Sequence, residues 1–258
     1  MIGIKDVRGY LDRMDKSFTS EEKLFFLNWI DINDYDYVVD FGAANGTMIA
    51  AIQEYQFNKS TTYIMVENNP QIKVEFDLRE TERVSGLKDI WERFPKGTKV
   101  LLILSSVVHE LSKHSVAELL AFIQRNVDTI VIRDMYWGKD EDLGISKQEI
   151  DVLRCIQASC DFCKKYEAIK RANGVGSSER KNLYEFFLKY TYTQNWDTEV
   201  KEHYFNKELI GLIESIDEDF ERTYWCQYVL PFKRNEILEK FGYEMTHPTH
   251  LKAIFTRR

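Results

Sequence analysis

The residues between positions 40 and 46 combine an acid, glycines and small side chains between an apolar run and a helix-forming run. Glycine lets the backbone turn sharply and approach a ligand closely. A helix that begins behind such a turn offers unpaired backbone N–H groups to a polar ligand. Glu67 ends the next apolar run, where an acid in a nucleoside-binding fold accepts hydrogen bonds from ribose hydroxyls. The pattern predicts two parts of one pocket, although a plain tight turn and a solvated strand end would have the same sequence.

A second group of polar residues, Ser105, Ser106, His109 and Glu110, follows a later apolar run. In an open α/β sheet the carboxyl ends of the strands face the ligand crevice. His109 could act there as a general base because the reference pKa of histidine is close to neutrality, and Glu110 could orient it or bind a substrate. Both residues could instead cap the following helix and only line the pocket.

Asp134 and Tyr136 lie at the end of the next apolar run along the chain. If that run is a neighbouring strand, its carboxyl end meets the same edge of the sheet. We therefore expect both side chains to face the substrate.

Apolar runs rich in β-branched residues alternate with segments of helix formers in the first half of the chain. Such alternation predicts a doubly wound, mostly parallel sheet with right-handed crossovers. The expected strands are 37–42, 61–67, 99–105 and 128–134, and the expected helices are 18–31, 47–54, 112–126 and a mixed stretch from 70 to about 78.

The alternation stops after Asp134. Residues 139 to about 195 are charged and helical in character apart from the loop-like stretch 173–178, which predicts a helical insertion or lid. A helix over 198–215, a strand over 220–230, a helix over 231–241 and a strand over 249–256 should then add an antiparallel pair at a sheet edge. The expected organisation is a core of residues 1–138, an insertion of 139–195 and a C-terminal part of the core, 196–258.

The composition is that of an ordinary globular protein, with 44% hydrophobic and 30% charged residues among 258. These values exclude disordered, collagen-like and disulfide-stapled classes. No apolar run approaches the ~20 residues that cross a bilayer, and the N-terminal residues do not resemble a secretory signal. We expect a cytoplasmic location without membrane contact; the sequence does not indicate an oligomeric state.

The net charge of −7 discourages binding of nucleic acid unless a local basic surface exists. Residues 164–181 are rich in lysine and arginine, and residues 184–196 are rich in aromatic rings. This stretch could contact single-stranded RNA or a nucleotide-like substrate. Tyr184, Phe187 and Tyr190 recur at helical spacing, however, and would also fit a helix core.

Cysteines crowd together at positions 155, 160 and 163. The spacing of Cys160 and Cys163 resembles half of a zinc site, but a second ligand pair is absent from the sequence. We therefore expect buried, reduced thiols and no metal.

The order of Asp40, Gly42 and Gly46 resembles the first motif of the class I S-adenosylmethionine-dependent methyltransferases, acid-x-Gly-x-Gly-x-Gly. Ala44 stands where the middle glycine is usual, and the resemblance covers roughly residues 35–135. It implies a Rossmann-like methyltransferase fold and S-adenosylmethionine as cofactor. The methionyl part would lie on Asp40 and the 42–46 backbone, and the ribose on Glu67.

The resemblance further implies an acidic residue beside the adenine, and a residue at the end of the expected strand 99–105 that contacts the cofactor. The candidates for these two positions are Asp89 and Ser105. His109, Glu110 and Asp134 are the catalytic candidates, although methyl transfer by positioning alone would need no base.

The hypothesis is methyl transfer to an unidentified acceptor, either a small molecule or RNA. One alternative is an NAD-dependent oxidoreductase, which a glycine-rich turn and a distal acid would also suit. Against it, the G-x-G-x-x-G spacing is missing after Gly42. Another alternative is a cofactor-binding protein without transfer activity.

Overall fold

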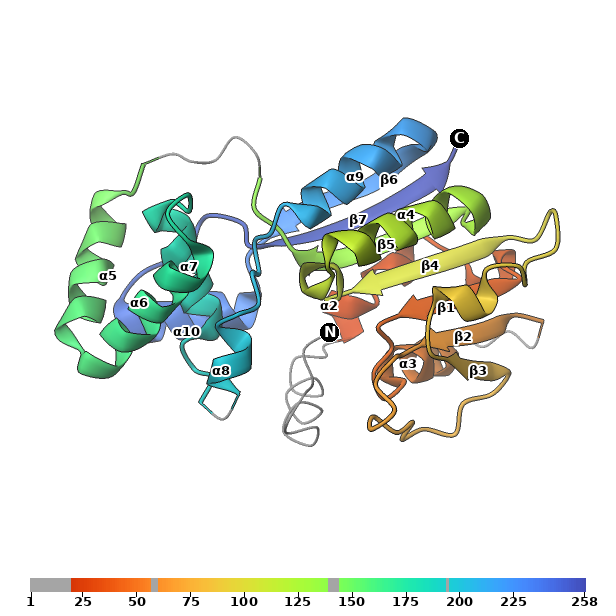
Figure 1. Ribbon diagram of the computed structural model, residues 1–258, viewed down its shortest axis with the longest axis horizontal. Helices are drawn as coiled ribbons and strands as arrows, with labels where there is room; N and C mark the ends of the chain where they lie inside the picture. The colour runs from red at the N-terminus through yellow and green to blue at the C-terminus, as the bar shows by residue number, and fades with distance from the viewer. Residues whose placement is uncertain (1–19, 57–59, 139–143, 194) are drawn as a thin grey trace.

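The computed structural model describes residues 20–56, 60–138, 144–193 and 195–258 (Figure 1). These residues contain a seven-stranded sheet with the strand order β3-β2-β1-β4-β5-β7-β6. Strands β1 to β5 are parallel, and β7 runs antiparallel to both β5 and β6. The strands are β1 (Tyr37–Phe41), β2 (Thr62–Val66), β3 (Thr81–Val84), β4 (Val100–Ser105), β5 (Thr129–Met135), β6 (Phe220–Tyr228) and β7 (His250–Arg257).

The predicted doubly wound sheet is confirmed, because helices cover both faces of the central strands (Figure 1). Alternate residues of each strand enter two separate cores, so that Leu102 packs toward one face and Leu101 toward the other. One face carries α4 (Lys113–Asn126) and α9 (Glu208–Asp219). The other carries α3 (Thr47–Tyr55), α2 (Ser20–Lys23) and the 3-10 helix η1 (Phe25–Asn28).

The local sequence explains several boundaries of these elements. Ser112 caps α4 by accepting a hydrogen bond from the Ser115 backbone N–H at 3.2 Å. Pro231 opens α10 (Pro231–Phe241), and Gly242 ends it with φ +63°. The predicted antiparallel pair at the sheet edge is also confirmed, since β6 and β7 lie beyond β5.

A second core lies in a helical region beside the sheet, at the left of Figure 1. It is built by α5 (Lys147–Ala158), α6 (Cys160–Asn173), α7 (Glu179–Lys189), α8 (Trp196–Glu199) and α10. Ile237 of α10 and Tyr243 behind it belong to this core, together with residues from α5 to α7. The division of the chain at residues 138 and 195 stays a prediction.

Three predicted helices differ from this structure. The expected helix 198–215 is interrupted, because α8 ends at Glu199 and α9 begins only at Glu208. The stretch 70–78 contains only turns, which Arg83 of β3 holds by donating to the carbonyls of Ile72 at 2.5 Å and Asn69 at 2.8 Å. The expected helix 18–31 begins outside the described residues; within them it is divided into α2, η1 and a further 3-10 helix, η2 (Ile32–Asp34). Phe26 and Ile32 are nevertheless buried in the core on this face of the sheet, whereas Trp29 is 63% exposed.

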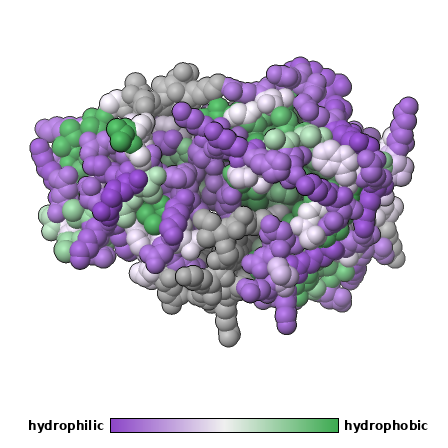
Figure 2. All heavy atoms as spheres, viewed as in Figure 1, coloured by the Kyte–Doolittle hydropathy of each residue, from purple (hydrophilic) through white to green (hydrophobic). Residues whose placement is uncertain are grey.

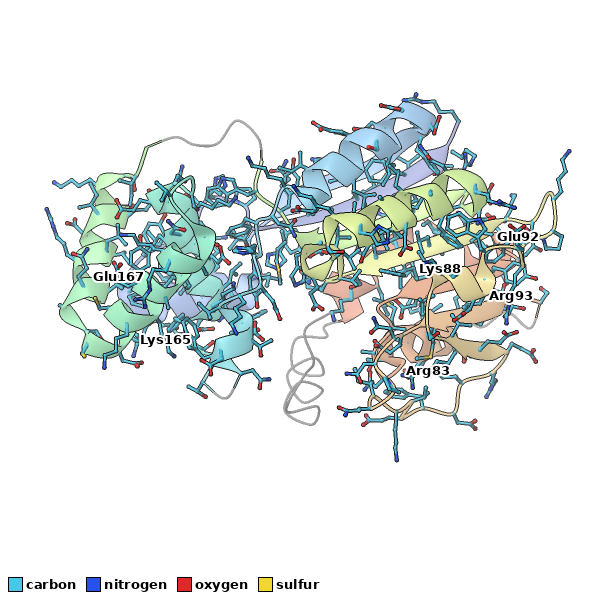
Figure 3. All side chains as sticks on the ribbon, viewed as in Figure 1. Arg83, Lys88, Glu92, Arg93, Lys165 and Glu167 are labelled. Carbon is cyan, nitrogen blue, oxygen red and sulfur yellow. The ribbon has the colours of Figure 1, made fainter. Side chains whose placement is uncertain are left out.

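The aromatic stretch 184–196 does not support contact with RNA. Tyr184, Phe187 and Tyr190 are buried in the helical core, where they cannot stack on bases. Lys165, labelled in Figure 3, donates to the carbonyls of Tyr190 at 2.6 Å and Tyr192 at 3.0 Å, so its charge caps the end of α7. Packing within the helical region therefore accounts for these rings and this lysine.

The cysteines are free thiols, as expected, but the expectation that they are buried is wrong. Cys155 and Cys160 are exposed, and Cys163 and Cys226 are partly exposed.

Hydrophilic residues cover most of the face seen in Figure 2. No helix in the described ranges has the length and apolar character that a bilayer crossing requires.

Candidate active site

The turn between β1 and α3 has a backbone that few side chains tolerate. Gly42, Ala44 and Gly46 have φ values of +79°, +47° and +91°. A Cβ atom added at Gly42 would lie 2.6 Å from Cγ2 of Val107, which follows β4. The glycines are thus required both by the left-handed backbone and by the close approach of the neighbouring strand end.

The carboxylate of Glu67 joins this turn to the end of β2. It accepts a hydrogen bond from the Ala44 backbone N–H at 3.1 Å and another from the Asn69 backbone N–H at 2.7 Å. Glu67 is buried. The structure therefore brings the predicted turn and the predicted ribose-binding acid together.

Asp40, at the end of β1, is 3% exposed. Its Oδ2 atom has no hydrogen-bond partner among the described residues. Burial raises the pKa of Asp40 to about 7, against the attraction of Lys23 and with a smaller contribution from Glu67. Such an orphaned acceptor is the kind of group that a polar ligand satisfies.

Asp89 and Ser105 follow or end two strands, β3 and β4, that β2 and β1 separate in the sheet. Asp89 follows β3 in the 3-10 helix η3 (Leu87–Ile90), is exposed, and accepts from the backbone N–H groups of Ser85 at 3.0 Å and Gly86 at 3.1 Å. Hydrogen bonds from Ser85 lower the pKa of Asp89. Ser105 ends β4, and its buried Oγ has no hydrogen-bond partner in the described part of the chain.

His109 and Asp134 form a buried pair behind the ends of β4 and β5. Asp134 Oδ1 lies 2.7 Å from His109 Nδ1. Asp134 Oδ2 accepts from the backbone N–H groups of Val107 and Val108 at 3.1 and 2.7 Å. The 3-10 helix η4 (Val108–Glu110) carries the histidine, so the strand ends fix both partners.

Charge around His109 alters several pKa values. Burial alone would lower the pKa of His109, but the attraction and hydrogen bond of Asp134, with Glu110 and Glu202 beyond, raise it to about 9. Burial and the nearby carboxylates raise the pKa of Glu202 to about 8, and burial raises that of Glu110. Like charges held close together favour protonation of some members of the group.

A cavity of about 460 Å³ lies between the strand ends and the helical region. Of the residues predicted to bind the cofactor, Gly42 and Ser105 line this cavity. Of those predicted to be catalytic, His109 and Glu110 line it. Asp134 is fully buried behind His109 and does not line the cavity. Its carboxylate instead contacts the His109 ring at Nδ1.

Tyr136 does not line this cavity, and its ring packs edge-on against Trp225 with the centroids 5.7 Å apart. The expectation that Tyr136 faces a substrate there is wrong. The tyrosine lies one pleat beyond Met135, whose side chain does line the cavity.

The far wall of the cavity comes from residues 198–208, which the sequence did not single out. Tyr204 stands edge-on to His109 with the ring centroids 5.4 Å apart and donates to Glu199 at 2.6 Å. Asn206 donates to the His109 carbonyl at 2.9 Å. Glu202 completes a group with His109 and Glu110 whose ligand atoms lie within 4.8 Å of one another. No motif marks these residues, because their function depends on a loop folding back over a distant strand end.

No protein-family model matches the sequence, and no curated protein matches it. Solved structures do match it over nearly its whole length. The pyocyanin biosynthetic protein PhzM aligns with a TM-score of 0.53 and 14% identity over 98% of this chain, which spans 59% of the PhzM chain.

Two plantazolicin methyltransferases, each in complex with a triazolic desmethylPZN analog and SAH, match a larger share of their own length. BamL aligns with a TM-score of 0.55 and 11% identity, covering 98% of this chain and 90% of BamL. BpumL aligns with a TM-score of 0.51 and 11% identity, covering 98% and 92%. The chain therefore has the Rossmann-like methyltransferase fold that the motif around Asp40 and Gly46 implied.

Proposed function

We propose that the protein is an S-adenosylmethionine-dependent methyltransferase that acts on a small-molecule acceptor. The observation that carries the proposal is the hydrogen bond from Ala44 to Glu67, which unites the glycine turn and the ribose-binding acid at adjacent strand ends. Two structural neighbours, BamL and BpumL, are methyltransferases by name and were crystallised with SAH. The fold and the pocket therefore point to the same cofactor.

The residues around the turn fit that cofactor. When bound, S-adenosylmethionine supplies an electrophilic methyl group on a sulfonium. Glu67 would bind the ribose hydroxyls, and Asp40 would meet the cationic amino end, whose charge would hold the buried carboxyl in its ionised form. Asp89 is proposed to contact the adenine of S-adenosylmethionine, and Ser105 is proposed to face this methyl donor.

His109 is proposed to act as the general base. Asp134 holds the ring through Nδ1 at 2.7 Å, which leaves Nε2 on the side of Glu110 and the cavity. As the acceptor oxygen or nitrogen forms its bond to the methyl carbon, its proton would pass to Nε2 while the sulfur keeps the electrons of the broken bond. Only the neutral imidazole can accept that proton.

The dimensions and lining of the cavity favour a small acceptor. A volume of about 460 Å³ suits a ligand of drug-like size. Tyr192, Tyr204 and Phe232 contribute rings to the lining. An aromatic or partly apolar acceptor would bury its surface against them.

Calorimetry with S-adenosylmethionine and SAH tests the cofactor assignment. Substitution of Asp40 or Glu67 with alanine should weaken binding at least about tenfold, since each removes charge-assisted hydrogen bonds worth roughly 1.5–3 kcal/mol. The exposed Asp151→Ala on α5 is the matched control and should bind as the wild type does. Circular dichroism should show that all three variants are folded.

Undiminished affinity in both Asp40→Ala and Glu67→Ala would contradict the assignment. A thermal shift with NAD but not with S-adenosylmethionine would instead favour an oxidoreductase. Methyl transfer from labelled donor to a panel of small phenols and amines then separates an enzyme from a binding protein that lacks transfer activity.

A further inference from the structure

Arg133 is a buried cation at the carboxyl end of β5. It is 6% exposed and lines the cavity. Its Nη1 donates to Ser106 Oγ at 2.6 Å and its Nε to the Tyr228 hydroxyl at 3.2 Å. Burial raises the pKa of Tyr228, so this phenol stays neutral. Both partners of the guanidinium are therefore uncharged.

The acids near Arg133 are engaged elsewhere. Asp134, the next residue, directs its carboxylate to η4 and His109. Glu22 pairs with Lys252 at 3.0 Å and also interacts with the Tyr228 hydroxyl, so this acid reaches Arg133 only through a neutral phenol. Lys252 stands beside Arg133 in the register of β7 and β5. Across the described ranges of the chain Arg133 forms no ion pair. A buried charge without a counter-ion is strongly unfavourable, and an anionic ligand would remove that penalty.

Two serines extend this donor group into the cavity. Ser105 is in register with Arg133 on the neighbouring strand, and its buried Oγ lacks a hydrogen-bond partner within the described part of the protein. Ser106 has φ +56° and also lines the cavity. His250, which also lines the cavity, adds no charge, because burial and the charge of Arg133 lower its pKa well below the ordinary value and keep the ring neutral.

We propose that Arg133, with Ser105 and Ser106, forms a carboxylate-binding subsite of the cavity. The proposal rests on the proposed methyltransferase function and adds the chemical class of a ligand group. A guanidinium binds a carboxylate through two parallel N–H···O bonds, and the serine hydroxyl could donate a third. The carboxylate is either that of the methyl donor's amino-acid end or one carried by the acceptor.

The carboxyl groups that line the cavity lie on the His109 side. Glu110 and Glu202 gather at the His109 ring, and Glu199 accepts from Tyr204 beside it. The two hydrogen-bond partners of Arg133 are hydroxyl groups. A ligand carboxylate would therefore find its guanidinium partner at the β5 end of the cavity.

The first experiment measures binding to the full chain by calorimetry. S-adenosylmethionine and decarboxylated S-adenosylmethionine test the donor, while benzoate and the neutral benzamide, offered to protein saturated with SAH, test the acceptor side. The variants are Arg133→Met, which keeps volume and removes charge, and Arg133→Lys, which keeps charge. Arg154→Met, an exposed residue on α5, is the matched control.

If the donor's carboxylate binds at Arg133, wild type should prefer S-adenosylmethionine over its decarboxylated form by about tenfold or more, and Arg133→Met should lose that preference. If the acceptor's carboxylate binds there, donor binding should be unchanged, and the wild type's preference for benzoate over benzamide should disappear in Arg133→Met. Arg133→Lys should recover part of whichever preference exists. Circular dichroism and thermal melts confirm that the variants are folded.

The subsite is excluded if wild type and Arg133→Met show the same ratios for both pairs of probes. It is also excluded if Arg154→Met changes them as much as Arg133→Met. Absence of S-adenosylmethionine binding to the wild type would contradict the proposed function instead, and benzoate against benzamide would still test Arg133 in the ligand-free protein.

Discussion

At the level of single residues, the carboxylate of Asp134 is fixed before any ligand binds. Backbone N–H groups of Val107 and Val108 occupy Oδ2, and Met135 N–H donates to Oδ1 at 2.7 Å. Burial would raise the pKa of Asp134, but His109 and these donors outweigh it and hold the pKa below its usual value. The histidine therefore faces a permanent negative charge.

The pH dependence of stability should report this pair. The pKa of His109 is about 9 in the folded protein against an ordinary 6.5. Its protonated form therefore stabilises the fold fully below pH 6.5, and this contribution is lost as the pH rises through about 9. The shift corresponds to about 3 kcal/mol in the free energy of unfolding. Urea denaturation at a series of pH values measures it.

Substitution of Asp134 with asparagine is the informative variant. Loss of the negative charge should lower the pKa of His109 and remove most of the decline in stability between pH 6.5 and about 9. If His109 is the base, kcat should rise with pH through about 9 in wild type and at lower pH in Asp134→Asn. Identical pH profiles of stability in both proteins would show that the pair is not charged as described.

Residue types alone identified part of this site. His109 and Asp134 could be predicted because each follows an apolar run, and parallel strands bring such ends together. Tyr204 and Glu202 could not, since the sequence predicted a helix over 198–215 where the structure has a loop between α8 and α9. Nothing in the sequence marked Arg133, because its place beside Ser105 depends on the pairing of β4 with β5.

At the level of elements, the turn after β1 depends on Gly42. Alanine there would be strained by φ +79° and by contact with Val107 Cγ2 at 2.6 Å. We expect Gly42→Ala to lower the free energy of unfolding by roughly 2–4 kcal/mol, the sum of backbone strain and overpacking.

Gly97 is the matched control, because its φ of +88° imposes the same backbone strain while nothing lies within 4 Å of the added Cβ. Gly97→Ala should cost only about 1 kcal/mol. Urea denaturation of both variants compares them, and equal losses would mean that the close approach of Val107 contributes nothing.

Apolar patterning predicted the central elements and failed where burial is shallow. β4 is a continuous buried run, and its boundaries were anticipated within a residue. β3 reads Thr-Glu-Arg-Val and is half exposed, so neither alternation nor a buried run marks it. It is a strand because it pairs with β2. The sequence of β3 alone does not reveal that pairing.

The loop opposite His109 is anchored by a buried ion pair of α7. Lys189 Nζ lies 2.6 Å from Glu185 Oε1, donates to the Glu202 carbonyl, and stands 4.1 Å from the centre of the Tyr204 ring. Glu185 also accepts from the Tyr204 backbone N–H at 3.3 Å. Helix α7 thereby fixes the backbone of Glu202 and Tyr204, which both line the cavity.

Replacing Lys189 with methionine should therefore be costly. It leaves the buried Glu185 without a counter-charge, and we expect a loss of about 3–5 kcal/mol in the free energy of unfolding. The half-exposed Lys170→Met, which breaks the pair with Glu167 on α6, should change the free energy of unfolding by less than about 0.5 kcal/mol. Urea denaturation measures both.

The double variant Lys189→Met/Glu185→Leu separates stability from positioning. It removes both buried charges and should recover most of the lost stability, while the loop still lacks its anchor. The pKa of His109, followed by NMR, should then fall because Glu202 is no longer held nearby. A His109 pKa equal to that of wild type would show that the loop is positioned without this pair.

At the level of the whole molecule, the chain builds its cavity between two bodies that share segments. The sheet stands beside a separate helical region (Figure 1). The sheet has an apolar core on each face, and the helical region has its own. The helical core takes residues from both sides of β6, since Ile237 and Met245 pack with residues of α5 and α7. The helices that follow β5 and the segment between β6 and β7 therefore depend on each other.

Excision of residues 139–195 tests whether they are a removable insertion. With a short Gly-Ser linker in their place, α10 and the segment behind it would expose Ile237, Tyr243 and Met245, which are at most 5% exposed in the intact protein. Removing Lys189 would also release the loop over His109. We expect an aggregating or molten product without cooperative thermal unfolding. A soluble product that unfolds cooperatively and binds S-adenosylmethionine would instead establish residues 139–195 as a separate lid on a self-sufficient sheet domain.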